Sequence, residues 1–66
     1  MVSDLAQILK TNFAWLGEDK FSGPLSYEAD SENPSMIIIH GVIGLGGMAI
    51  EARAFQKMLE AYEAKN

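Results

Sequence analysis

The segment Met36–Ile43 constrains the fold of this chain more than any other part of the sequence. It reads Met-Ile-Ile-Ile-His-Gly-Val-Ile, with apolar residues at both odd and even positions. A strand of this kind is typical of sheets that are covered on both faces. The chain has only 66 residues, and a domain of that size has little material with which to cover a second face. The sequence therefore predicts association with another protein surface.

The residues before this strand predict its partner. From Phe21 to Asp30, apolar and polar residues alternate with a period of two, which indicates a half-exposed strand. The segment 30–35 is rich in turn-forming residues, so a hairpin is expected. We expect Tyr27 to lie opposite Ile37. Pro24 cannot donate a hydrogen bond to a neighbouring strand and indicates that the first strand lies at an edge.

Helices are predicted on both sides of the hairpin. The first helix is predicted from apolar residues at helical spacing, and we expect Gly17 to end it. These apolar residues are Leu5, Ile8, Leu9, Phe13 and Leu16. The second runs from about Met48 to Ala64. Residues 1–66 thus form a single small α+β domain of α-β-β-α order, a two-stranded antiparallel hairpin flanked by helices and completed by dimerisation.

Composition excludes several classes of function. Nine acidic and five basic residues give a net charge of −4, which argues against direct nucleic-acid binding because phosphates require Lys and Arg. Cysteine is absent, so no disulfide is expected. The uncharged run 36–50 is too short to span a membrane as a helix. The first residues lack the features of a signal peptide, and a cytoplasmic location without membrane association is expected.

The glycine-rich segment Gly41–Gly47 precedes the second predicted helix, where phosphate-binding loops are found. It contains no Gly-Lys-Ser/Thr and no Gly-x-Gly-x-x-Gly. We interpret it as a tight turn in which glycines supply positive φ and allow close backbone approach. Anion binding by the amides of Met48 and Ala49 is the alternative.

His40 is the single histidine of the chain. Ser22, Ser26, Asp19 and Asp30 supply the other residue types of a hydrolytic triad, but a chain of this size has little room for a cleft. We therefore expect His40 to pack at an interface. We expect no enzymatic activity, no cofactor and no metal.

The predicted interface combines the second face of the Ile-rich strand, a second apolar strip of the long helix, and the one tryptophan. Its seam is expected at the long helix or at the edge of the Ile-rich strand. Its residues are Met36, Ile38, His40, Val42, Ile50, Ala54, Met58 and Trp15.

Glu28, Asp30 and Glu32 occur at every second position and predict a short acidic row. Such a row commonly discourages strand addition at an edge. The favoured function is a non-enzymatic homo-oligomeric adaptor or regulator, a homodimer or a higher oligomer. The alternative is an acidic inhibitor that binds a host protein or a nucleic-acid-binding enzyme through its apolar face and the acidic row. A very small enzyme or ligand-binding protein with a site around His40 and the glycine turn is the third hypothesis.

Overall fold

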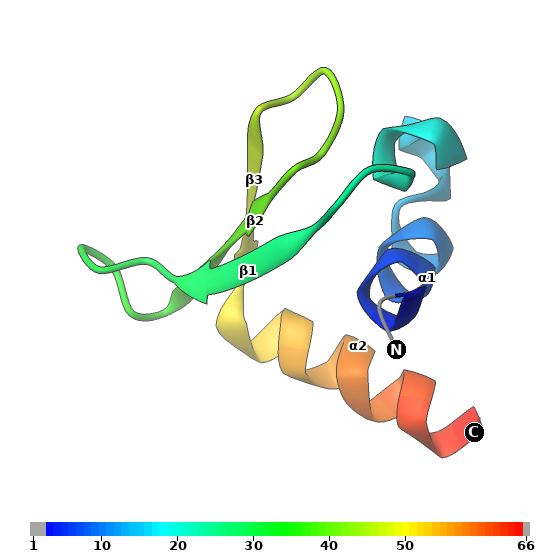
Figure 1. The fold of residues 1–66 in the computed structure, drawn as a ribbon. Helices are drawn as coiled ribbons and strands as arrows, with labels where there is room; N and C mark the ends of the chain where they lie inside the picture. The colour runs from blue at the N-terminus through cyan, green and yellow to red at the C-terminus, as the bar shows by residue number, and fades with distance from the viewer. Residues whose placement is uncertain (1–2, 66) are drawn as a thin grey trace.

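The computed structural model describes residues 3–65 and has α+β architecture (Figure 1). The helices lie on one side of a small antiparallel sheet. Along the chain the elements are α1 (Ser3–Asn12), the 3₁₀ turns η1 (Ala14–Leu16) and η2 (Glu18–Phe21), β1 (Ser26–Ala29), β2 (Met36–His40), β3 (Gly47–Glu51) and α2 (Ala52–Lys65). The α+β class is thus confirmed, but the order of elements is α-β-β-β-α.

The sheet has three strands in the order β1-β2-β3, with both pairs antiparallel. The expected two-stranded hairpin was therefore wrong. Residues 48–51, predicted as the start of the long helix, belong to β3, and α2 begins at Ala52. The alternation of small residues with Met48 and Ile50 has the period of a strand. The sequence predicted a helix here because Met48 and Ala52 also have helical spacing.

The register of the first hairpin differs from the prediction by two residues. Tyr27 lies opposite Ile39 instead of Ile37. The hairpin closes through the Asp30 N–H, which donates to the Met36 carbonyl at 3.0 Å. The predicted register would set Asp30 opposite Pro34, which has no N–H to contribute. A shift of two residues leaves each side chain on its predicted face.

The first strand and the first helix are both shorter than predicted. Phe21, expected in the strand, ends η2 and is buried in the core. The α1 helix ends at Asn12, whose side-chain Nδ2 donates to the Ile8 carbonyl at 2.7 Å, and η1 follows it. Gly17 has a φ of 104° and follows η1 directly. The prediction that Gly17 ends the first helix was therefore wrong, because it ends η1 and not α1.

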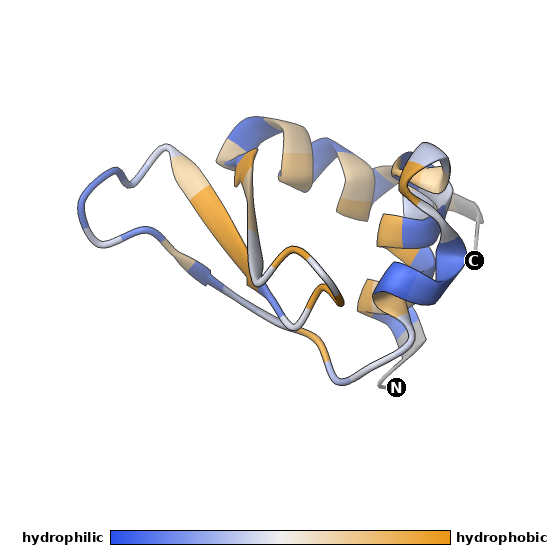
Figure 2. Cartoon of the chain, turned by 90° about the horizontal axis from the view of Figure 1, so that it is seen from above, coloured by the Kyte–Doolittle hydropathy of each residue, from blue (hydrophilic) through white to orange (hydrophobic). Residues whose placement is uncertain are grey.

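The core lies between the sheet and the helices. It is formed by a cluster of buried residues from α1, η2, the sheet, the loop after β2 and α2. The cluster contains Leu9, Phe21, Ile39, Val42, Ile50 and Phe55. In Figure 2, β2 is hydrophobic along most of its length, whereas the turn that joins it to β1 is hydrophilic. The central strand therefore carries much of the apolar surface of the sheet.

Candidate functional site

One face of the sheet has no cover from the helices. Side chains alternate across the strands, and Tyr27 and Ile39 point toward Phe55 and the core. The opposite face therefore carries Ile38 and its neighbours. We call this the open face, with residues Ser26, Glu28, Met36, Ile38, His40 and Ala49. Met36 and Ile38 are half-buried and the others are exposed.

His40 and Glu28 form the strongest polar contact of the open face. The His40 Nε2 and Glu28 Oε2 atoms are 2.6 Å apart, and the side chains are 48% and 66% exposed. The contact is diagonal, because Ser26 is the direct neighbour of His40 across the strands. Ser26, His40 and Glu28 thus share one face, but no hydrogen bond joins Ser26 to His40 within residues 3–65. On an exposed face these groups have no enclosed space from which water is excluded.

The other residues considered for a triad have different roles. The Ser22 hydroxyl donates to the Asp19 carbonyl at 2.8 Å, which closes the end of η2. The Asp30 carboxylate accepts a hydrogen bond from the Glu32 N–H at 3.0 Å. Among the described residues, no group of three or more His, Cys, Asp or Glu side chains could hold a metal ion.

The predicted interface residues divide between surface and core. Met36, Ile38 and His40 lie on the open face, and Trp15 in η1 is 79% exposed beside Phe13. Val42 and Ile50 are instead 2% and 7% exposed and belong to the core. Ile50 is also a strand residue, so it cannot belong to a helical strip.

Ala54 and Met58 pack against the core cluster. The apolar side of α2 is thus used within the chain, and its remaining surface is rich in charged and polar residues, including Arg53, Gln56 and Lys57. The helix is for this reason a poor candidate for the seam. The edge of the Ile-rich strand is not available either, because β2 is paired on both sides.

The free edges of the sheet belong to β1 and β3. In antiparallel pairs, successive residues direct their backbone N–H and C=O groups alternately toward and away from the partner strand. The Ala52 N–H donates to the Ser35 carbonyl at 2.7 Å, so Ala52 faces β2. By alternation, the backbone groups of Gly47, Ala49 and Glu51 point outward from β3. We call this row the β3 edge.

The predicted acidic row is not continuous. Glu28 lies on the open face beside His40, Asp30 holds the turn through its carboxylate, and Glu32 is exposed in that turn. All three are at the β1 side of the sheet. Carboxylates in this position make β1 the more protected of the two edges.

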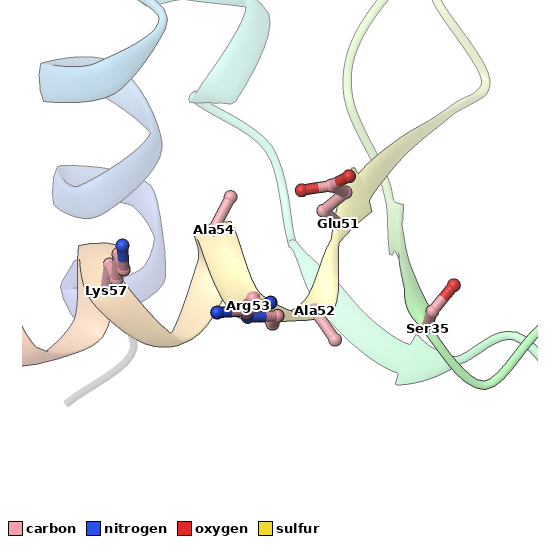
Figure 3. A pocket seen from close by; sticks show the side chains of 6 residues that line it. All are labelled: Ser35, Glu51, Ala52, Arg53, Ala54 and Lys57. Atoms are coloured by element: carbon pink, nitrogen blue, oxygen red, sulfur yellow. The ribbon is translucent and has the colours of Figure 1, made fainter.

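The sequence reasoning missed both the β3 edge and the surface next to it. A depression of about 350 Å³ lies where β3 meets α2. Figure 3 shows the side chains of Arg53 and Lys57 on α2 and of Glu51 at the end of β3, which line it. Its remaining lining residues are Ser35, Ala52 and Ala54. The loop between β2 and β3 also exposes Ile43 and Leu45. The strand period of residues 47–51 was the signal that could have revealed this edge.

Within residues 3–65, no helix has both the length and the apolar character needed to cross a membrane. Compared with protein-family models, with curated proteins and with solved structures, the chain gives no significant match.

Proposed function

We propose that this chain is a small non-enzymatic protein–protein interaction module that acts as a homodimeric adaptor or regulator. The observation that carries the proposal is the one-sided cover of the sheet. α1 and α2 pack on the side of Phe55, and the other side retains Met36 and Ile38 (Figure 1). Apolar side chains grouped on a surface are typical of interaction sites.

Two further features support an interaction role. Trp15, Ile43 and Leu45 are large apolar residues with about half or more of their surface exposed. Tryptophan is among the residues that contribute most to binding energy at protein interfaces. A homodimer is the commonest closed assembly of identical chains, and it gives a small domain additional buried surface.

The acidic-inhibitor alternative has less support. Glu28 is in contact with His40, and the Asp30 carboxylate accepts a bond inside its own turn. The Glu32 side chain is exposed, and its carboxylate takes part in neither of these two contacts. A basic partner would thus have to replace contacts that Glu28 and Asp30 already make.

The test is the mass of the purified chain in solution. We expect sedimentation equilibrium and native mass spectrometry at low micromolar concentration to give twice the chain mass of 7.2 kDa. The dimer should persist at high salt, because the proposed contacts are apolar and backbone contacts rather than ion pairs. A monomer throughout the micromolar range would overturn the homodimer.

A further inference from the structure

We propose that two copies of this chain join through their β3 edges, so that both sheets become one continuous antiparallel sheet. The inference rests on the proposed homodimer, and it places the seam at a sheet edge, so that Met36 and Ile38 remain on the open face outside the seam. It begins with the outward N–H and C=O groups of Gly47 and Ala49, which form no hydrogen bond with another element of residues 3–65. An unpaired edge of this kind is a template for another strand.

The side chains of the β3 edge permit close approach of a second strand. Gly47, Met48, Ala49 and Ile50 are uncharged, Glu51 at the end of the strand is the one charged residue of β3, and the outward backbone groups of Gly47 and Ala49 belong to the two smallest residues. The strand contains no proline, so no residue lacks a donor. The β1 edge differs, because Glu28 and Asp30 would bring carboxylates of two copies together and repel.

A two-fold axis at Ala49 uses the whole edge. In that register Ala49 pairs with Ala49 of the partner subunit, and Gly47 pairs with Glu51 of the partner subunit. The Glu51 carboxylate then faces a residue without a side chain, so like charges are not opposed. Each contact occurs twice, as the symmetry of an isologous dimer requires.

The same register brings the exposed loop of one copy to the depression of the other. Two residues before Gly47, Leu45 is 47% exposed. Because the start of β3 in one copy lies beside the end of β3 in the other, the loop that carries Leu45 comes next to the start of α2 in the partner subunit, where Arg53 follows β3 by two residues. Arg53 lines the depression beside α2, together with Ala52 and Ala54 (Figure 3). The apolar loop residue and the space beside α2 thus meet twice in one dimer.

A second copy is the occupant that these observations favour. A strand from an unrelated protein would use the backbone groups of the edge but would leave Leu45 exposed. In the symmetric dimer, the edge, Leu45 and the depression at Arg53 are all used in a single register. No two like charges are opposed in this register, which suits two chains that each have a net charge of −4.

The first test replaces an outward N–H with proline. We expect Ala49→Pro to yield a folded monomer, because the lost donor points away from β2 and proline is tolerated at edge positions. The matched control is Ala29→Pro in β1. The Asp30 N–H donates to Met36, so the Ala29 N–H points outward from the opposite edge. This control should remain a dimer, with circular dichroism reporting the fold of both variants.

The second test keeps the backbone intact. We expect Leu45→Ser to raise the dissociation constant of the dimer at least tenfold in sedimentation equilibrium, because each dimer loses two apolar contacts. The matched control is Ile43→Ser in the same loop, where the side chain is 48% exposed. Its dissociation constant should stay within about threefold of the wild-type value.

The outcomes separate the two proposals. A wild-type monomer overturns the homodimer and the β3 seam together. A wild-type dimer that persists in Ala49→Pro and in Leu45→Ser leaves the homodimer standing and overturns the seam. If Ala49→Pro unfolds, the Leu45→Ser and Ile43→Ser pair decides: equal dissociation constants reject the seam, and a selective loss in Leu45→Ser supports it.

Discussion

The ring of Tyr27 rests against the ring of Phe55, with centroids 4.9 Å apart and ring planes inclined by 57°. This contact joins β1 to α2. Because α2 follows β3, at the opposite edge, a contact with Tyr27 means that the Phe55 side chain reaches past β2 to the far edge of the sheet. The first turns of one helix thereby reach all three strands on this face.

Phe55→Ala removes the side chain through which α2 packs on the sheet. Phe55 is buried in the core cluster, and truncation of a buried phenylalanine costs about 3 to 5 kcal/mol. We expect a large fall in the free energy of unfolding measured by urea titration. Tyr27→Phe is the control, because it retains the ring contact, and it should unfold at nearly the wild-type urea concentration. An unchanged midpoint for Phe55→Ala would contradict the packing described here.

The two faces of β2 can be distinguished by one substitution at neighbouring positions. Ile39→Lys places an ammonium group in the core, where an unpaired charge is very costly, and this variant should not fold. Ile38→Lys places the same group on the open face beside Glu28, and it should fold with a stability within about 1 kcal/mol of wild type. Thermal unfolding monitored by circular dichroism measures both. Similar unfolding temperatures would contradict the assignment of the faces.

Ile38→Lys also distinguishes the edge from the face as the place where two copies join. With pairing at the β3 edge, this variant should remain a dimer in sedimentation equilibrium. A dimer formed by two open faces would bring the two introduced ammonium groups together at its centre and would dissociate. Loss of the dimer in this folded variant would therefore argue for face-to-face packing.

Gly41 and Gly46 should respond differently to alanine. Both have positive φ, 94° and 76°, so alanine at either position carries a conformational cost of about 1 to 2 kcal/mol. A Cβ at Gly41 would also overlap the Pro24 carbonyl oxygen, whereas a Cβ at Gly46 meets no atom within 4 Å. We expect Gly41→Ala to lose at least about 3 kcal/mol and Gly46→Ala much less. Equal losses in urea titration would exclude the close approach at Gly41.

The phenol of Tyr62 should ionise at unusually high pH. Partial burial, followed by the nearby Asp4 carboxylate and its hydrogen bond at 3.3 Å, raises the pKa of Tyr62 above its usual value of 10.0. The folded state thus favours the neutral phenol. The contribution of Tyr62 to stability is present below the pKa that its phenol has in the unfolded chain. It is lost as the pH rises through the pKa of the phenol in the folded chain.

Tyr62→Phe isolates this effect. The stability advantage of wild type over the variant should shrink as the pH of the urea titration is raised beyond about 10. The phenolate absorbance of the variant should also lack the component with the higher pKa. A wild-type advantage that grows with pH would reverse the sign and contradict the role of Asp4.

The sequence predicted the features that depend on local patterns. The two helices, the edge position of β1, the turn at 30–35 and the positive φ of Gly41 all follow from apolar spacing or from the conformations that particular residues allow. The placement of Ile38 and His40 on the face opposite Ile39 was also predicted. Side-chain alternation preserved it even though the register was wrong by two residues.

The third strand could not be predicted from the same patterns. Residues 48–51 fit a helix by spacing, and their strand conformation depends on pairing with β2, which is a tertiary interaction. Once β3 takes that place, Ile50 enters the core and α2 loses its first turn. The candidate surface changed for the same reason, because an edge strand can be identified only when the order of the strands is known.

The hydrogen bond between Tyr62 and Asp4 joins the last helix to the first. Ribosomes deliver a chain from its first residue onward, so α1 emerges long before the helix on which it packs. The buried cluster that contains Leu9 also contains Phe55, which is synthesised much later. The core cluster can therefore be completed only after α2 has been synthesised. Until then, the earlier segments lack the contacts that α2 provides.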